Sequence, residues 1–562
     1  MTRHVVWQAA LALLGVVLVF GVLFRLAASQ VTVVQPEAGG AYVEGVLGYA
    51  SLVNPILTYG GGQAGGVSED VAALVFEGLT RLDDRQRPVP ALATDWEVGD
   101  SGAVFEFHLR QDVSWHDGAP LTAADAVFTI QAIQDPGYQG DPALQALWRT
   151  VTVESPDDYT VRFSLTEPFP SFLYYTTLGL LPAHLLSDVP AADLPASGYS
   201  TSRPIGTGPF RVESLSPERI VLVANQGYWG QKPYLQRVEL WSFGDEDALL
   251  ASYQRGEIDG FRVTSTDLLP ALARLEGLQL LSAGQVGYGA VFLNLDRETA
   301  PFFQVPEVRQ AMLYALDRQL LIDTALAGQG LVASSPLPPM LWAHEPAVRE
   351  YGYDPERAAG LLDSSGWLDS DGDRIRDQAG SAFRFELLTG PGLAMERLAG
   401  AIAEQWRSIG LDVTVRQADA DELDALLRSR DYSAVLTDVS LSADPDPYPL
   451  WHSTQTSPPG QNISGFSDEV ADLAMEEIRT TVDQASQQAA YSAFQREFAE
   501  KVPALLLYYP VATYAVDSRV QGVQLGSLLR ASDRFRNIAD WYRETLERVV
   551  TGDAVLDSSP EP

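Results

Sequence analysis

Alternating apolar and polar residues predict half-buried β-strands in the first half of the chain. Residues 103–110 (AVFEFHLR) and 159–165 (YTVRFSL) alternate in this way, which is typical of strands with one face on a core. Leu505–Leu507 is expected to be a fully buried strand that ends at Pro510. Further strands are expected over four ranges of similar character, namely 219–224, 237–243, 289–295 and 383–389.

Capping residues and three-to-four spacing of apolar positions predict helices between these strands. Ser68 is a candidate N-cap for a helix over 68–79, and Thr122 with Asp125 forms a capping-box pattern. Helices of the second half are expected over 307–328 after Pro306, over 355–365, over 394–409 and over 468–500. Because strands and helices mix without strict alternation, the pattern favours a mixed α/β or α+β fold.

An apolar run at positions 5–24 predicts one N-terminal transmembrane helix within residues 1–30, since about 20 residues cross a bilayer. The run is longer than the apolar region of a secretory signal, and Arg25 follows it. Ala27–Ser29 leaves a removed signal as the alternative. Residues 26–44 are expected to be a spacer, with the body of the protein outside the cytoplasm, extracellular or periplasmic.

Charge and cysteine content narrow the function classes. Lys and Arg number 38 against 74 Asp and Glu, a formal net charge of −36. Such a surface repels phosphate backbones and anionic headgroups, so nucleic-acid binding and electrostatic membrane binding are disfavoured. The sequence has no cysteine, which excludes disulfides, thiolate chemistry and attachment through a lipidated N-terminal cysteine.

The search for catalytic motifs predicts no enzyme. The six histidines do not have the spacing of a metal site. Residues 60–65 (GGGQAG) match G-x-G-x-x-G, but they follow Asn54–Pro55 rather than an unbroken strand. A flexible loop is therefore favoured over a nucleotide site.

A series of motifs follows along residues 45–520. They are VFEGLTRLD (75–83), PALATDWEV (90–98), FEFHLRQDVSWHDGAPLTAADAVFT (105–129), TVRFSLTEPFP (160–170), PIGTGPFRV (204–212), NQGYWGQKPYL (225–235), RGEIDG (255–260), FLNL (292–295), VPEVRQAMLYALDRQLLI (305–322), YDPERAAGLLDSSGW (353–367) and DPDPY (444–448). In this order they resemble the extracellular solute-binding proteins of ABC transporters, family 5, the peptide- and nickel-binding type.

The resemblance implies a two-lobed periplasmic-binding-protein-like fold that closes on its ligand about a hinge. Lobe I has an inserted subdomain, and an acidic disordered tail ends the chain. The expected boundaries are 41–76, 203–290 and 508–547 for lobe I, 77–202 for the inserted subdomain, 291–507 for lobe II and 548–562 for the tail.

Several motif residues have structural explanations of their own. In PIGTGPF, Gly206 and Gly208 are expected to adopt backbone angles that other residues resist. In RGEIDG, Gly256 is expected to end a helix before a short strand. Most of the series therefore identifies the scaffold rather than ligand contacts.

Asp444 is the main candidate for ligand binding. The resemblance implies that an aspartate at this place in lobe II pairs with the α-ammonium group of a peptide, a strong charge-assisted contact. Asp446 lies two residues further on and competes for that role. The alternative is a loop aspartate that caps backbone amides.

Aromatic and amide side chains near predicted strand ends, and others close to Asp444, are further candidates for lining a peptide or sugar pocket. They are Tyr49, Asn54, Tyr288, Asn294, Tyr448 and Trp451. Ordinary core packing is the alternative for each of them.

Residues 369–377 (DSDGDRIRD) place Asp369, Asp371 and Asp373 at alternate positions, followed by Asp377. This resembles part of a calcium loop, although the glycine, Gly372, is not at the sixth loop position and no glutamate occupies the twelfth. A solvated acidic turn is favoured, and a structural calcium ion is the alternative. No other cofactor is expected.

Together these features predict an extracytoplasmic receptor, anchored in the cell membrane, that delivers a peptide or similar small polar solute to an ABC permease. We expect it to act as a monomer and to perform no covalent chemistry. Two alternatives remain, an exported hydrolase that uses Asp444 and Asp446, and a ligand-sensing partner of a membrane receptor.

Overall fold

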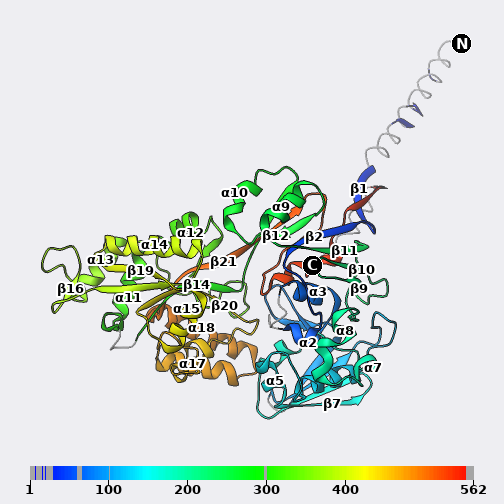
Figure 1. Cartoon of the computed structure of the whole chain (residues 1–562), viewed down its shortest axis with the longest axis horizontal. Coiled ribbons are helices and arrows are strands. Elements are labelled where there is room, and N and C mark those ends of the chain that lie inside the picture. The colour runs from blue at the N-terminus through cyan, green and yellow to red at the C-terminus, as the bar shows by residue number, and fades with distance from the viewer. Residues whose placement is uncertain are drawn as a thin grey trace.

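The computed structural model describes residues 30–59, 66–99, 102–295 and 300–551, together with Trp7, Gly15, Val16, Val19 and Phe20 (Figure 1). Most of the predicted membrane segment 5–24 lies outside these residues, as do the GGGQAG loop and residues 552–562. Within the described part of the chain, no helix has the length and apolar character to cross a membrane.

One long mixed sheet runs through the molecule. Twelve of the described strands belong to it, in the order β19-β18-β20-β14-β21-β12-β2-β11-β10-β9, and β13 and β15 also pair with β21. Their bounds are Ala41–Leu47 (β2), Phe210–Leu215 (β9), Arg219–Ala224 (β10), Arg237–Phe243 (β11), Gly260–Arg262 (β12), Leu278–Gly284 (β13), Gly287–Leu293 (β14), Gly330–Val332 (β15), Arg384–Thr389 (β18), Asp412–Gln417 (β19), Ala434–Ser440 (β20) and Ala504–Asp517 (β21).

We call the strands β2 and β9–β13, with the helices on them, lobe I. Its helices are α2 (Pro55–Thr58), α3 (Val67–Val75), α9 (Glu246–Gln254) and α10 (Leu269–Leu272). Lobe II comprises β14, β15 and β18–β20 with their helices, which lie to the left in Figure 1. They are α11 (Pro306–Tyr314), α12 (Arg318–Ala325), α13 (Pro355–Ser364), α14 (Leu393–Ser408), α15 (Ala420–Ser429), α16 (Tyr448–Trp451), α17 (Glu469–Thr480) and α18 (Gln484–Lys501).

A subdomain with its own sheet packs on lobe I. Its strand order is β5-β6-β8-β7, and β3 pairs with β4 beside it. The bounds are Thr80–Leu82 (β3), Pro88–Pro90 (β4), Ala93–Gly99 (β5), Val104–Leu109 (β6), Val151–Asp157 (β7), Thr160–Leu165 (β8), Ala123–Gln134 (α4), Pro142–Trp148 (α5), Phe172–Tyr175 (α6), Ala183–Leu186 (α7) and Gly198–Thr201 (α8). One buried apolar cluster joins subdomain and lobe I, whereas other clusters fill lobe II.

The lobes are connected through β21 and through the step from β13 to β14. The residues of β21 are buried in both lobes but half-exposed at Pro510–Ala512, where the strand passes between them. There Gln285 N donates to Pro510 O over 2.8 Å. The prediction that this strand ends at Pro510 was wrong. Proline has no N–H to donate, but at this position the strand uses only the carbonyl of Pro510, so the strand continues through it.

Most of the predicted strands were confirmed, β10 and β11 with the predicted bounds. The capping box of α4 is also present, with Thr122 N donating to Asp125 Oδ2 over 2.9 Å. Three helix predictions need correction. Gly66, not Ser68, precedes α3; the predicted helix 307–328 divides into α11 and α12; and the predicted helix 468–500 divides into α17 and α18.

The predicted spacer 26–44 contains two strands. Its first strand, β1 (Gln30–Glu37), pairs antiparallel with β22 (Glu544–Thr551) at the other end of the chain. The spacer prediction was wrong because the partner strand is more than 500 residues away in the sequence, where no local pattern reports it. Four residues of the predicted tail, 548–551, belong to β22.

A buried ionic network fixes the C-terminal segment on lobe I. The guanidinium of Arg534 donates to both carboxylate oxygens of Asp70 over 2.7 and 2.6 Å and to Glu44 over 3.0 Å. The hydroxyls of Tyr42 and Tyr514 also bond to Glu44. Charges buried together in this way are stable only as a complete set, since loss of one partner leaves the others unpaired.

Candidate ligand-binding site

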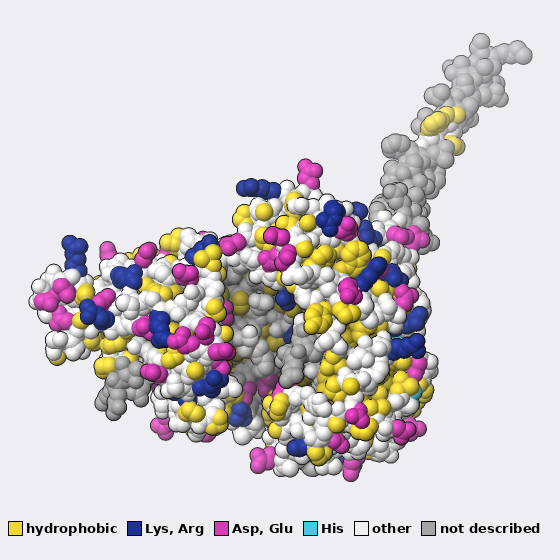
Figure 2. All heavy atoms as spheres, viewed as in Figure 1, with side chains coloured by type: hydrophobic (Ala, Val, Ile, Leu, Met, Phe, Trp, Pro, Cys, Tyr) yellow, Lys and Arg dark blue, Asp and Glu magenta, His cyan; other side chains and the backbone are white. Residues whose placement is uncertain are grey.

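A cavity of about 650 Å³ lies between lobe I and lobe II. Figure 2 shows the surface hollowed between the two halves of the molecule. Lobe II contributes Leu441–Asp444, while lobe I, the subdomain and the C-terminal segment supply the opposite wall. A second cavity of about 430 Å³ lies between lobe II and the subdomain, and Tyr174 and Asp444 line both. A ligand in these cavities would contact both lobes.

Asp444 lies in the loop that follows β20. Its Oδ1 is sealed from solvent and has no hydrogen-bond partner among the described residues. Burial raises the pKa of this carboxyl to about 7, and the nearby charge of Asp446 adds to the rise. Hydrogen bonding to the Ser171 side chain and to the Asp446 backbone and the charge of Arg479 oppose it. A buried carboxylate oxygen without a partner is costly, and a cationic ligand group would satisfy it.

Asp446 has partners of its own. Its Oδ2 accepts hydrogen bonds from Arg479 Nε (2.9 Å) and Nη2 (2.6 Å), and its Oδ1 accepts one from Tyr448 N (3.0 Å). The guanidinium of Arg479 also lies 3.8 Å from the centre of the Tyr448 ring, which stacks on His452. Among the described residues that line the two cavities, Asp444 is present and Asp446 is not.

The lobe I wall is organised around Glu77, which directly follows α3 and Phe76. Its carboxylate accepts hydrogen bonds from Thr207 Oγ1 (2.8 Å), Tyr228 Oη (2.8 Å) and Trp229 Nε1 (3.0 Å). Burial raises the pKa of Glu77, and these three bonds oppose the rise. Three of the sequence motifs, VFEGL, GTGPF and NQGYW, thus meet at one carboxylate.

Sequence reasoning missed most of the lobe I wall. Beside Glu77, the cavity is lined by the aromatic residues Tyr59, Phe76, Tyr175 and Tyr228 and by the charged residues Glu69, Arg81, Arg530, Asp533 and Arg536. The motif series could have pointed to Glu77. Arg530 and its neighbours lie beyond residue 520, outside that series, so only the folded chain brings them to the cavity.

The predicted site residues of lobe I lie elsewhere. Tyr49 is 65% exposed and does not line the described cavity. Asn54 is fully buried, accepts from Ile56 N at the start of α2, and donates to Ser200 Oγ over 3.0 Å. The structure thus gives Asn54 a capping role, and a ligand contact by either residue stays a prediction.

The predicted aromatic and amide residues of lobe II are packed in its core. Tyr288 is fully buried, and Trp451 stacks on Phe292 with ring centres 5.5 Å apart. Asn294 donates to Arg430 O and Tyr432 O over 3.0 and 2.9 Å. Of the predicted set, Asp444 alone lines the described cavity, so the roles of the others in binding stay predictions.

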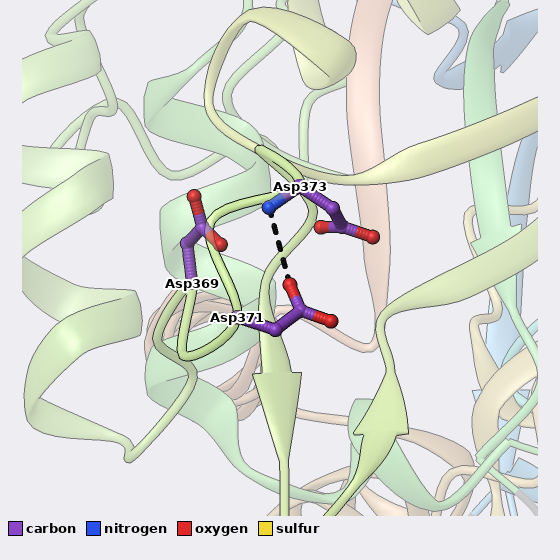
Figure 3. Close-up of side chains that lie close together, drawn as sticks. All are labelled: Asp369, Asp371 and Asp373. Atoms are coloured by element: carbon purple, nitrogen blue, oxygen red, sulfur yellow. Dashed lines mark hydrogen bonds between the residues drawn. The ribbon is translucent and has the colours of Figure 1, made fainter.

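The acidic loop of lobe II carries three aspartates whose side chains lie close together (Figure 3). Asp369, Asp371 and Asp373 are exposed, and one carboxylate oxygen of each lies within 4.8 Å of the others. Asp369 accepts from Gly372 N and Arg374 N, and Asp371 from Asp373 N. The fourth predicted ligand, Asp377, accepts from Ser370, so backbone and side-chain donors already bond to several of these oxygens.

Two lobes joined by paired crossover strands, with a cavity between them, define a two-lobed solute-binding protein. The chain belongs to the bacterial extracellular solute-binding proteins, family 5, whose middle-region model matches residues 87–461. It is therefore a solute-binding receptor of an ABC importer, and its family is one of binding proteins.

Relatives support this membership over nearly the whole chain. The oligopeptide-binding protein AppA of Bacillus subtilis is 30% identical over 497 residues, which cover 87% of this chain and 89% of AppA. The structure of AppA with a nonapeptide covers 90% of this chain and 99% of its own, with a TM-score of 0.65. NikZ of Campylobacter jejuni with Ni(L-His) is 26% identical, covers 89% and 99%, and has a TM-score of 0.67.

Proposed function

We propose that this receptor captures peptides and that Asp444 binds their α-ammonium group. The observation that carries the proposal is the buried, unpartnered Oδ1 of Asp444 at the junction of the two cavities. An ammonium group would supply the missing donor and a charge-assisted bond. The likeness to AppA, an oligopeptide-binding protein, supports a peptide as ligand.

The other walls suit a peptide as well. Tyr59, Tyr175 and Tyr228 offer aromatic faces with polar tips, which pack against varied side chains without demanding one sequence. Because Arg479 neutralises Asp446, Asp444 is the acidic group of this loop that remains for the ligand.

Isothermal titration calorimetry of the purified full-length protein with a series of alanine peptides tests the proposal. Asp444→Asn should weaken binding by about 2–5 kcal/mol, because it removes one partner of a buried charge pair. Asp446→Asn is the matched control and should have a much smaller effect. Unchanged affinity in Asp444→Asn would refute the assignment of Asp444, and failure of all peptides to bind would refute a peptide ligand.

We infer that lobes I and II, with the boundaries expected from the sequence except that all of β14 belongs to lobe II, close as two rigid bodies on the ligand and present it to membrane permease subunits. Their separate apolar clusters support this division. Two connections that pass side by side at Gln285 and Pro510 form a narrow hinge. We propose that the receptor acts as a monomer.

Residues 5–24 are proposed to anchor the protein, with the body outside the cytoplasm. The length of their apolar run supports an anchor, and the absence of cysteine removes the lipid route. An anchor would raise the effective concentration of the receptor near its permease. For the acidic loop 369–377 we favour a hydrogen-bonded turn, with a structural calcium ion as the alternative.

A further inference from the structure

Arg530 lines the cavity on the wall opposite Asp444, and its guanidinium makes one ion pair and one ring contact with the protein but no hydrogen bond among the described residues. The side chain is 31% exposed and its guanidinium lies 4.8 Å from the centre of the Tyr59 ring. Its one charged contact is with Glu69, where Nε lies 3.4 Å from Oε1. Within the described part of the chain, no hydrogen bond from this guanidinium is present.

The backbone holds Arg530 in place. Leu529 N and Arg530 N both donate to Asp533 Oδ2, over 2.7 and 2.9 Å, at the start of the short helix η7 (Ala531–Phe535). The guanidinium lies over the Tyr59 ring in a cation–π contact. The ion pair with Glu69 and the ring contact favour one orientation of the side chain, so less conformational entropy is lost when it binds a ligand.

The other two cations of the cavity wall are less suited to bind a ligand. Arg536 donates to Ser527 O and Asp84 and forms an ion pair with Asp533. Arg81 is exposed, so water solvates its charge and weakens any ion pair that it forms. Arg530 is therefore the half-buried cation with free donors.

We propose that the terminal Nη1 and Nη2 groups of Arg530 bind the C-terminal carboxylate of the peptide whose α-ammonium group Asp444 binds. The inference rests on the proposed function and specifies its ligands as peptides with both ends free. A guanidinium binds a carboxylate through two parallel hydrogen bonds. Glu69 contacts the Nε side of Arg530, which leaves the two terminal groups for the ligand.

The arrangement also accounts for closure. Asp444 belongs to lobe II, and Arg530 belongs to the C-terminal segment that the Arg534 network fixes on lobe I. A peptide with opposite charges at its two ends would bridge the lobes. It would bind the closed form better than the open form, as a closing ligand must.

Burial raises the pKa of Glu69, which favours its neutral form beside a ligand carboxylate.

Calorimetry with three forms of the same short alanine peptides tests the proposal: the free peptide, its C-terminal amide and its N-acetyl derivative. The full-length wild-type protein should bind the free peptide about tenfold or more tightly than the amide. Arg530→Gln should abolish that preference and leave the affinity for the amide unchanged. Arg81→Gln is the control and should keep the preference. Arg530→Lys, which keeps the charge but loses the fork, should retain a reduced preference.

Three results would overturn the proposal. Equal affinity of the wild type for free peptide and amide would refute the role of Arg530 and leave peptide capture by Asp444 intact. A larger loss of preference in Arg81→Gln than in Arg530→Gln would assign the carboxylate to Arg81. If the wild type bound none of the peptides, the proposed function would fail together with this inference. Matching melting temperatures show that each variant is folded. If Arg530→Gln does not fold, Arg530→Lys is the variant that tests the role of Arg530.

Discussion

Asp444 and Asp446 are two residues apart and have opposite environments. Both are acidic, both precede a proline, and nothing in the sequence distinguishes their roles. In the structure Arg479 binds Asp446 through two hydrogen bonds, while Asp444 lines the cavity and has one sealed oxygen without a hydrogen-bond partner among the described residues. The difference arises from Arg479, which α17 brings to the loop from 33 residues away.

The raised pKa of Asp444 predicts how peptide affinity depends on pH. Its carboxyl must be ionised to pair with an ammonium group, and its pKa is about 7. As the pH falls below 7 the protonated form prevails, so affinity should fall by roughly tenfold per unit. Above about pH 8 the α-amino group of the peptide loses its proton, so affinity should fall again.

Titrations of one peptide between pH 5 and pH 9 measure this profile. Asp444→Asn should bind weakly and show no acidic fall between pH 5 and pH 7. An acidic midpoint near pH 4 in the wild type would contradict the prediction, because it would indicate an ordinary solvated carboxyl.

At the scale of elements, close packing rather than unusual backbone angles explains the glycines of PIGTGPF. The sequence led us to expect special φ angles, but neither Gly206 nor Gly208 has a positive φ. A Cβ on Gly206 would lie 1.9 Å from Val75 O, and one on Gly208 would lie 2.8 Å from Leu74 O. These glycines let the strand connection contact the end of α3, next to Glu77.

Gly206→Ala should therefore destabilise lobe I by about 1–3 kcal/mol, because backbone must move to admit the methyl group. Thermal unfolding by calorimetry measures the effect as a lower melting temperature. Gly198→Ala is the matched control, since no atom lies within 4 Å of its added Cβ, and its effect should stay within about 0.5 kcal/mol. Equal melting temperatures for the two variants would contradict the packing explanation.

The division of the predicted helix 307–328 into α11 and α12 also depends on contacts that are distant in sequence. The apolar spacing of 307–328 continues through the break between α11 and α12, so periodicity alone predicts one helix. The break is set by Asp317, whose carboxylate accepts from Leu320 N and begins α12. Arg318 then donates to Ala333, Leu506 and Tyr351 carbonyl oxygens. These partners are distant in sequence, and they decide where the second helix lies.

At the scale of the whole molecule, the proposed closure requires the lobes to move about the crossover strands while each core stays intact. Polar contacts cross the cleft, as where Trp342 Nε1 of lobe II donates to Tyr174 Oη of the subdomain over 2.8 Å. Such contacts can be exchanged for water at moderate cost. We therefore expect that the two lobes change their relative position without exposing either core.

Small-angle scattering of the purified protein should detect this motion. A saturating peptide should decrease the radius of gyration, because the ligand binds both walls and favours the closed form. Asp444→Asn at the same peptide concentration should give a smaller decrease, since less of it is bound. An unchanged radius in the wild type, at a concentration where calorimetry shows saturation, would contradict closure.

The sequence by itself determined the class of fold and most of its elements. Strands such as β10 and β11 and the capping box of α4 depend on neighbouring residues, so local periodicity and capping were sufficient to predict them. The absence of cysteine and the order of the motifs are also properties of the sequence alone, so they were sufficient to narrow the possible classes of function.

Only the tertiary structure decided which residues form the cavity. Asp444, Glu77 and Arg530 come from three distant segments, and their roles depend on which partners already occupy their hydrogen bonds. The pairing of β1 with β22 likewise joins residues from opposite ends of the chain. Burial and the pairing of charges are properties of neighbours in space, and a pattern along the chain reports neighbours in sequence.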